Sequence, residues 1–505
     1  MVNEINSTLD PGGRDSPQNG PSSGGSSVLD NSRLLVGSRL VSSVLAWAGT
    51  VLIVRALTKE EFGQFSFVFA LLALVSIVGD LGLGRIAVGG VMDTSPGHDR
   101  GKFAANYIML RTSLGVISCS LAMAYVLLTD QSSMVRWATL VGIGVVMLAT
   151  PASAYDVAYQ AHDRMAMVAI GGIVGTLVQT ALVVALVFAG GNVVWFIVPA
   201  VFRELAELAT KWREAHRLVE FRYDLDIALW WPMLKEAVPL SIGTAVAFVY
   251  YKIDQLMLER MVGDEAVATY AVQYKFADLM HIIPWALTTS MLASMVRFWP
   301  DDSPGLRRVT RETGQLLLMV GALLITGFVV FAERAVGLLY TDAYVEGANA
   351  GRMLMASEGL IFFSMLAFTA LVATGRHAIY PVITIAGLIF NVVLNLVVIP
   401  EWSYEGAAFT TLLTEVIVGG LLWWQLLRIP GMRPLGFLHA GPILLASVVA
   451  GLVGWGSLGI VHWILGCVIT AAVFIGILAA IGVDGQRGLR PLIGPALRTT
   501  GLDDQ

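Results

Sequence analysis

The chain has 505 residues, of which 56% are apolar and only 14% are charged. A soluble protein of this size would need more charge to cover its surface. Apolar runs of about 20 residues recur along the sequence, each long enough to cross a bilayer as a helix. The net charge of −5 indicates no particular partner, because in membrane proteins the placement of charge matters more than its sum. We therefore expect an all-α polytopic membrane protein.

Apolar runs and the charged breaks between them predict about fourteen transmembrane helices. We expect a disordered cytoplasmic tail, an N-lobe of six spans, a cytoplasmic connector, a C-lobe of six spans, two C-terminal spans and a cytoplasmic C-terminal tail. Their predicted bounds are 1–32, 33–211, 212–228, 229–428, 429–485 and 486–505. Residues 378–400 and 405–427 are predicted to be two separate spans of the C-lobe.

Lysine and arginine predict the orientation. With the N-terminus in the cytoplasm, most of the 32 Lys and Arg fall in or beside cytoplasmic segments. Those on the other side are Arg55, Lys59, Arg136, Arg260, Arg334 and Arg352. This bias agrees with the positive-inside rule. An even number of spans then places both termini in the cytoplasm. The outer loops are short, so we expect no external domain that carries chemistry.

Two segments resemble copies of one helix–loop–helix unit. VRALTKEEFGQF, residues 54–65, aligns with ERMVGDEAVATY, residues 259–270, at an offset of 205. A second alignment, at an offset of 212, pairs Gln179 with Asn391. An even number of spans separates the copies, so we expect two parallel lobes related by an axis along the membrane normal. In such proteins the binding site lies near the midplane between the lobes, and transport rocks one lobe against the other.

Ionisable groups in the predicted spans require a reason, because each costs about 2.5–3.5 kcal/mol at a helix centre. The four spans beside the repeat carry three cations and three acids: Arg39, Lys252, Lys275, Asp80, Asp254 and Asp278. Elsewhere, Glu358 and Glu415 are expected to form hydrogen bonds between helices.

The span at 266–293 carries a polar stripe. Tyr270, Tyr274, Asp278, His281 and Trp285 follow steps of three or four residues, which places them on one helical face. We expect that face to line a cavity rather than to meet lipid. Lys275 flanks the stripe. It can line the same cavity, pair with Asp278, or do both.

Other intramembrane charges leave two interpretations open. Lys252 and Asp254 point in nearly opposite directions at helical spacing. Lys252 is therefore either a cavity cation or one partner of an ion pair between helices. Arg39 can face the cavity or extend to the cytoplasmic interface. Asp80 can act in ion coupling, or it can cap a helix or pair with Arg85.

The sequence lacks the motifs of common catalytic sites. It contains no P-loop, no metal-spaced His/Cys cluster and no nucleophile elbow. Cys119 and Cys467 both lie in apolar runs and are expected to be buried hydrophobes. We therefore expect a protein that is not an enzyme, that has no cofactor and that binds no nucleic acid.

Three segments together resemble a known family. They are EEFGQF followed by an apolar span and GDLGLG, residues 60–84; the segment 254–279, from DQLML to KFADL; and the segment 371–415, from LVATGR to TLLTE. They resemble the Wzx-type polysaccharide or O-antigen flippases of the multidrug/oligosaccharidyl-lipid/polysaccharide (MOP) exporter superfamily. The resemblance covers about residues 33–427. The last two spans and the N-terminal tail carry no motif of the family.

The resemblance implies a MATE-like fold and a flippase of the plasma (inner) membrane. Such a protein moves a polyprenyl-diphosphate-linked oligosaccharide to the outer leaflet by alternating access, for O-antigen or exopolysaccharide biosynthesis. The first, second, seventh and eighth spans line its cavity. Membrane lipids and polysaccharide polymerase or export machinery are the further partners implied.

The residues on those spans then receive expected roles. Cations would hold the diphosphate, and aromatic side chains would contact the sugars: Arg39, Lys252, Lys275, Tyr270, Tyr274 and Trp285. The candidates for coupling to H⁺ or Na⁺ are Asp80, Asp254 and Asp278. Whether transport is coupled at all is left open.

Other functions compete with this interpretation. A multidrug or organic-cation antiporter of the same superfamily should have an acidic cavity. The three cations and three acids predicted for this cavity do not distinguish a cationic from an anionic substrate. A peptidoglycan-lipid flippase is a closer alternative. A membrane polymerase or ligase of lipid-linked glycans is less well supported, because such enzymes usually need a large external loop. A membrane scaffold without transport is a further alternative.

Overall fold

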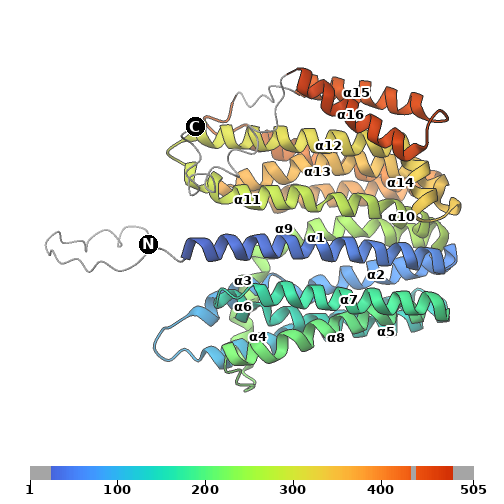
Figure 1. The fold of residues 1–505 in the computed structure, drawn as a ribbon. Coiled ribbons are helices and arrows are strands. Elements are labelled where there is room, and N and C mark those ends of the chain that lie inside the picture. Colours follow the sequence, from blue (N-terminus) through green and yellow to red (C-terminus); the bar gives the residue numbers. More distant parts are fainter. Residues whose placement is uncertain (1–23, 434–439, 482–505) are drawn as a thin grey trace.

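The structure is a computed structural model that describes residues 24–433 and 440–481. Its first lobe, the N-lobe, is a bundle of eight helices in which the longer ones lie side by side (Figure 1). They are α1 (Gly24–Ala56), α2 (Lys59–Asp80), α3 (Leu83–Met92), α4 (Arg100–Leu128), α5 (Ser133–Ala154), α6 (Asp156–Ala161), α7 (Ala166–Ala189) and α8 (Val193–Leu218).

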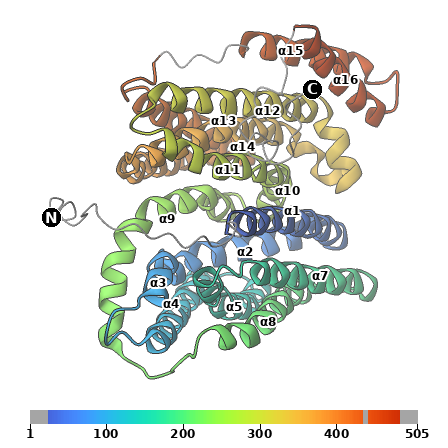
Figure 2. The ribbon, with the colours of Figure 1, turned by 60° about the vertical axis from the view of Figure 1, so that its left-hand side comes forward.

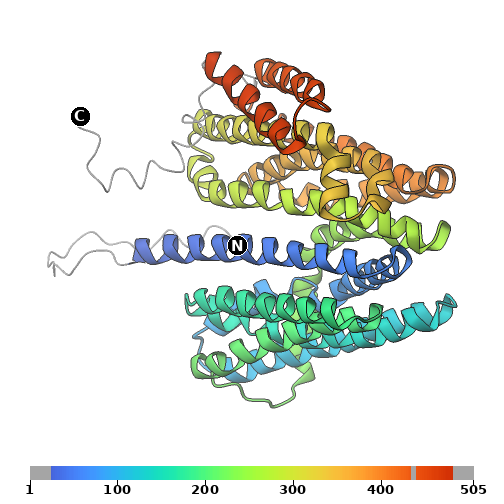
Figure 3. The ribbon, with the colours of Figure 1, turned by 45° about the vertical axis from the view of Figure 1, so that its right-hand side comes forward.

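The second lobe, the C-lobe, is built from the helices that follow. They are η1 (Ile227–Leu229), α9 (Trp230–Met261), α10 (Asp264–Met280), α11 (Ile282–Phe298), α12 (Ser303–Leu339), η2 (Asp342–Gly347), α13 (Ala348–Ala373), η3 (His377–Ile379) and α14 (Tyr380–Leu426). Two last helices, α15 (Ala440–Ser457) and α16 (Trp463–Ala480), pack against α12 on the side away from the N-lobe (Figure 3).

Local sequence determines where α2 begins and ends. Thr58 forms a capping box with Glu61, in which each side chain accepts a hydrogen bond from the backbone N–H of the other residue. At the far end, Leu81 and Gly82 have φ of 38° and 68°, so the helix ends there and α3 begins as a separate helix. The span expected at 65–90 is therefore a helix, a left-handed turn and a second helix.

Helix α14 folds back on itself. Ser403 has φ 50° and ψ −134°, which breaks the helix, and a Cβ on Gly406 would lie 2.8 Å from the Val398 carbonyl oxygen. The two arms pack antiparallel, since Asn391 donates to the Thr414 hydroxyl at 3.3 Å. The two spans predicted at 378–400 and 405–427 match these arms.

Eleven described helices, or twelve with the bent helix α9, are long and apolar enough to cross a membrane. This number treats the α14 hairpin as a single helix and leaves out α8, which carries several charged residues. Counting α8 as one pass and α14 as two gives the expected number of about fourteen. The chain is therefore an all-helical polytopic membrane protein, as predicted.

The two lobes meet along α2, which packs against α9 and α10. Their shared core contains Phe67 and Leu71 from α2, Leu258 from α9 and Val267 from α10, each at most 3% exposed. Helix α1 packs mainly on α7 and runs along the boundary between the lobes (Figures 1 and 3). The helices on either side of the two repeat copies, α1 and α2 in the N-lobe and α9 and α10 in the C-lobe, are thus the ones that face each other.

Polar contacts join the lobes at the end where α1 stops and α2 begins, which we call the α1–α2 end. Arg55 donates to the Leu339 carbonyl oxygen at 2.8 Å, and Lys59 forms an ion pair with Glu346. Gln131, in the loop after α4, donates to Glu259 at 2.8 Å. These contacts close the α1–α2 end of the lobe boundary.

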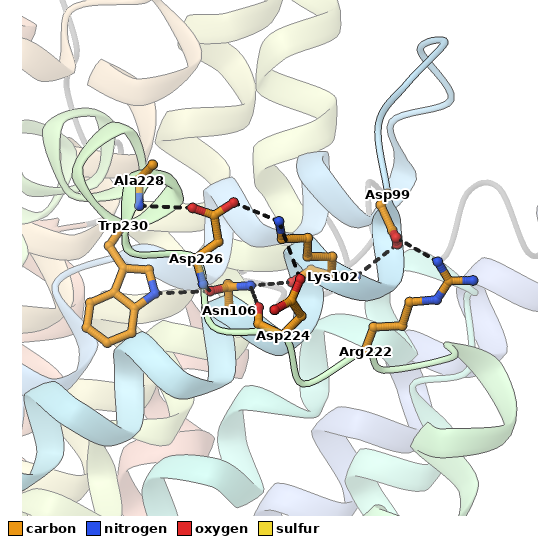
Figure 4. A network of polar contacts seen from close by, with 8 residues as sticks. All are labelled: Asp99, Lys102, Asn106, Arg222, Asp224, Asp226, Ala228 and Trp230. Atoms are coloured by element: carbon orange, nitrogen blue, oxygen red, sulfur yellow. Dashed lines mark hydrogen bonds and ion pairs between the residues drawn. The ribbon is translucent and has the colours of Figure 1, made fainter.

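The connector between the lobes is held on the start of α4 (Figure 4). Asn106 is fully buried; its amide donates to the Asp224 carbonyl oxygen at 2.8 Å and its oxygen accepts from the Asp226 N–H at 2.8 Å. Lys102 pairs with Asp226 at 2.7 Å. The hydrogen bond from Lys102 lowers the pKa of Asp226 below its usual range. Arg222 adds an ion pair with Asp99 at 3.0 Å.

Helix α9 bends by 58° between residues 227–239 and 241–261 (Figure 2). Its first part packs in the N-lobe core through Met233 and Ala237. Its second part packs on α10 and α14. Pro239 lies at the bend, as expected for a residue that removes a helix hydrogen bond.

Three predicted domain boundaries differ from this packing. Helix α1 begins at Gly24, inside the predicted tail 1–32, and residues 1–23 lie outside the described residues. Helix α8 continues to Leu218, into the predicted connector 212–228. The packing of the C-lobe begins at the bend of α9 and not at residue 229. The predicted C-terminal tail 486–505 also lies outside the described residues.

Candidate functional site

A cavity of about 300 Å³ lies between the lobes. The N-lobe lines it with residues of α1, α2 and α7: Ala46, Gly49, Thr50, Ile53, Phe62, Phe65, Ser66, Phe69, Ala70, Ala73, Gln179, Thr180 and Val183. The C-lobe lines it with residues of α9 and α10: Lys252, Gln255, Ala271, Tyr274, Lys275 and Asp278. The sequence predicted four of these five helices, and α7 is the addition.

The lining follows the sequence repeat. At the offset of 205, five C-lobe lining residues correspond to residues that line the opposite wall. The pairs are Gln255 with Thr50, Ala271 with Ser66, Tyr274 with Phe69, Lys275 with Ala70, and Asp278 with Ala73. The cavity is thus pseudo-symmetric in shape, but all its charges are on the C-lobe wall.

Lys252 is held by aromatic rings rather than by an acid. Its ammonium lies 4.9 Å from the centre of the Tyr251 ring and 5.0 Å from that of Tyr274. It forms no ion pair within the described residues. Of the two interpretations of Lys252, the cavity cation agrees with this geometry.

Lys275 and Asp278 form the second charged feature of the wall. Their side chains pair at 3.7 Å, and Tyr251 donates to the Asp278 carboxylate at 3.0 Å. Both side chains also line the cavity, so pairing and lining are compatible. The cavity therefore contains two lysines and one aspartate.

Asp254 and Tyr270 lie behind the cavity wall. Asp254 is 1% exposed and accepts hydrogen bonds from the Tyr270 hydroxyl and, at 2.8 Å, from the Gln255 N–H. Tyr270 is fully buried and its hydroxyl also lies 3.4 Å from that of Thr411. The expectation that Tyr270 lines the cavity is wrong, because its face of α10 turns into the C-lobe at that level.

Three other predicted site residues lie away from the cavity. Arg39 is exposed, and its guanidinium lies 4.4 Å from the centre of the Trp285 ring. Trp285 lies in α11 and is not among the residues that line the cavity. Asp80 pairs with Arg111 of α4 at 2.8 Å, so its structural role is an ion pair inside the N-lobe.

Residues that sequence reasoning missed make up most of the N-lobe wall. Phe62, Phe65 and Phe69 follow steps of three and four along α2 and face the cavity. Gln179 comes from α7. The sequence alignment at an offset of 212 pairs Gln179 with Asn391 and so drew attention to both amides. Only Gln179 lines the cavity, whereas Asn391 is buried in α14.

Two further buried acids bond to residues of other helices, as expected. Glu415 of α14 accepts from the Tyr250 hydroxyl of α9. Glu358 of α13 contacts His281 at 2.9 Å. Within residues 24–433 and 440–481, no cluster of three or more His, Cys, Asp or Glu side chains is arranged to hold a metal ion.

Comparison with known proteins identifies the family. Residues 28–292 match the family described as polysaccharide biosynthesis protein, and residues 239–397 match the MatE family. The capsular polysaccharide biosynthesis protein CapF of Staphylococcus aureus is 19% identical over 202 residues, which are 39% of this chain and 50% of CapF. The uncharacterized membrane protein MJ1068 of Methanocaldococcus jannaschii is 21% identical over 190 residues, 37% of this chain and 36% of that protein. The matches span half or less of these relatives.

Solved structures share the fold. The lipid II flippase MurJ in an inward closed conformation superposes with a TM-score of 0.72 and 13% identity, over 91% of this chain and 99% of MurJ. A MOP-superfamily transporter from Pyrococcus furiosus, described as having a binding pocket of reverse polarity, gives a TM-score of 0.57 and 13% identity, over 81% and 96% of the two chains. An outward-facing multidrug resistance MATE transporter gives 0.56 at 13% identity, over 81% and 96%.

The expected MATE-like fold is thus confirmed. The polysaccharide biosynthesis match covers just over half of the sequence, and it includes α1, α2, α9 and α10 around the cavity. The chain therefore belongs to the polysaccharide biosynthesis protein family, whose members are membrane transporters of the MOP superfamily and not enzymes.

Proposed function

We propose that this protein is a flippase for a polyprenyl-diphosphate-linked oligosaccharide of surface polysaccharide biosynthesis. The observation that carries the proposal is Lys252, a cavity cation that lies against two aromatic rings and forms no salt bridge with a carboxylate of the described residues. An ammonium in a site of low dielectric constant attracts anions strongly. A diphosphate is an anion that Lys side chains bind through charge-assisted hydrogen bonds.

The charge balance favours an anionic substrate over an organic cation. Arg39, Asp80 and Asp254 are not in the cavity, which leaves Lys252 and Lys275 against Asp278. The excess of one positive charge opposes the binding of a cationic drug. It supports a phosphate-bearing substrate instead.

Alternating access agrees with the way the lobes meet. The lobes are joined at the α1–α2 end by Arg55, Lys59 and Gln131. The positive-inside rule assigns this end to the outside and both termini to the cytoplasm. In this interpretation the structure is closed to the outside, and release of the substrate requires these contacts to break.

Asp254 and Asp278 are our candidates for coupling to H⁺ or Na⁺. Asp278 lines the cavity beside both lysines, so a bound diphosphate would compete with it for their charge. Asp254 is buried directly behind the wall and bonds to Tyr270. Asp80 is a weaker candidate because it already pairs with Arg111.

Replacement of the cavity lysines tests the proposal. We expect Lys252→Gln and Lys275→Gln each to abolish surface glycan export while the protein remains in the membrane, because glutamine keeps hydrogen-bonding capacity but loses the charge. Lys235→Gln is the matched control, since Lys235 is exposed on the same helix as Lys252. Export at the wild-type level by both cavity variants would refute the assignment.

The same strains separate this function from a peptidoglycan-lipid flippase. Surface glycan and cell-wall synthesis are measured together in cells that carry the variants. Loss of surface glycan with normal cell-wall synthesis supports the proposal. Loss of cell-wall synthesis would favour the alternative.

A further inference from the structure

The two walls of the cavity have different chemistry. The C-lobe wall carries Lys252, Lys275 and Asp278, whereas the N-lobe wall has no charged residue. Its largest lining groups are Phe62, Phe65 and Phe69, and the ring centres of Phe65 and Phe69 are 4.6 Å apart. The duplicated scaffold therefore holds an ionic surface opposite an aromatic one.

From this asymmetry we infer a sugar-binding subsite on the N-lobe wall, formed by Phe65, Phe69, Ala73 and Gln179. This inference rests on the proposed function, and it assigns the recognition of the sugar attached to the diphosphate to the N-lobe. The sequence analysis expected Tyr270, Tyr274 and Trp285 to contact the sugars, whereas this inference gives sugar recognition to residues of α2 and α7.

Aromatic rings and one amide suit the surface of a sugar. The C–H groups of a pyranose ring carry partial positive charge and are attracted to the negative face of an aromatic ring. Hydroxyl groups need a donor and an acceptor, and a glutamine amide supplies both. Gln179 forms no hydrogen bond with another described residue, so its amide is free for a ligand.

The dimensions of the cavity favour the first sugar over the distal ones. About 300 Å³ is at the small end of ligand sites. A cavity of this size suits the diphosphate and the first sugar better than a long glycan. The first sugar is bonded directly to the diphosphate, so when Lys252 and Lys275 hold the phosphates, that sugar faces the opposite wall.

The sequence repeat shows where space for a sugar arises. Lys275 and Asp278 correspond to Ala70 and Ala73 on the N-lobe wall. Because alanine side chains are small, these two positions leave space beside the rings of Phe65 and Phe69. A larger side chain at Ala73 would fill this space without changing any charge.

Binding of two lipid probes to the purified full-length protein tests the inference. One probe is polyprenyl diphosphate without sugar, and the other is polyprenyl diphosphate that carries one sugar. We expect Phe65→Leu to weaken binding of the glycosylated probe about threefold to tenfold, because leucine keeps apolar volume but loses the ring. Gln179→Leu and Ala73→Leu should also weaken that probe. All three should leave the sugar-free probe unchanged.

Two control variants make the outcomes distinguishable. Phe188→Leu changes an exposed phenylalanine of α7 outside the cavity and should bind both probes like the wild type. Lys252→Gln should weaken both probes. The subsite is refuted if Phe65→Leu and Ala73→Leu weaken both probes equally, which would indicate a lipid-binding wall, or weaken neither. If the wild type binds neither probe, the proposed function itself fails.

Discussion

Two buried tyrosines of the C-lobe have hydroxyl groups in opposite situations. Tyr270 is fully buried and donates to the Asp254 carboxylate. Tyr344 is 2% exposed, and its hydroxyl has no hydrogen-bond partner in the described residues. The same substitution, tyrosine to phenylalanine, therefore removes a charge-assisted hydrogen bond at one position and an unsatisfied group at the other.

We predict that Tyr270→Phe lowers the free energy of unfolding by about 1.5–3 kcal/mol, the usual contribution of a hydrogen bond to a charged group. Tyr344→Phe should be neutral or slightly stabilising, because it removes a polar atom that burial leaves unpaired. Thermal unfolding of both variants in one detergent measures the difference. Equal shifts in Tm would contradict the contacts of Asp254.

Helical geometry predicted some cavity residues and misplaced others. The near-opposite directions of Lys252 and Asp254 follow from a rotation of 100° per residue, and the structure has one in the cavity and one buried. The prediction that the stripe from Tyr270 to Trp285 lines the cavity is wrong at both of these residues. A shared helical face predicts the direction of a side chain but not how far the cavity extends along the helix. It could not indicate that Tyr270 faces α14 or that the cavity lining on this helix ends at Asp278.

At the scale of helices, one glycine allows α2 and α10 to touch. A Cβ on Gly63 would lie 2.0 Å from the Asp264 carbonyl oxygen, and backbone atoms cannot move aside as a flexible side chain can. Gln64 reinforces the contact by donating to the Asp264 carboxylate at 3.2 Å. Closure at the α1–α2 end therefore depends on the absence of a side chain at Gly63.

We predict that Gly63→Ala shifts the protein away from the closed state. The measurement is the labelling of Ala73→Cys, a cavity position, by a membrane-impermeant maleimide added outside cells in which Cys119 and Cys467 are replaced by alanine. Gly63→Ala should increase the labelling. Gly172→Ala is the control, because a Cβ there meets no atom within 4 Å. Unchanged labelling in Gly63→Ala would contradict the role of this contact.

Most helices could be predicted from apolar runs, but bends and turns could not. The arms of α14 match the predicted spans because a short polar segment separates two apolar runs. The bend of α9 assigns residues before Pro239 to the N-lobe, and hydropathy has no signal for which lobe a helix packs against. Glycine- and serine-rich composition likewise suggested a tail up to residue 32, although α1 begins at Gly24.

At the scale of the whole molecule, the repeat explains both the shape and the limits of the sequence interpretation. Equivalent helices of the two lobes face each other across the cavity, so the repeat predicted where the cavity lies. It could not predict the contacts that close one end, because Arg55, Lys59 and Gln131 bind residues far away in the chain.

If transport rocks the lobes apart at the α1–α2 end, a covalent link across that end should stop it. Gln131 and Glu259 lie on different lobes with 2.8 Å between their side-chain nitrogen and oxygen. We predict that Gln131→Cys with Glu259→Cys, joined by a short reducible cross-linker, abolishes glycan export, and that a reductant restores it. The background again lacks Cys119 and Cys467.

A link inside one lobe is the matched control for this experiment. Arg352 and Glu333 pair at 3.0 Å, and both belong to the C-lobe near the same end. Cysteines at these positions, cross-linked to the same extent, should leave export intact because the lobe moves as a unit. Export that persists after complete cross-linking of residues 131 and 259 would show that the α1–α2 end does not open. Loss of export with both links would contradict the prediction that the C-lobe moves as a unit.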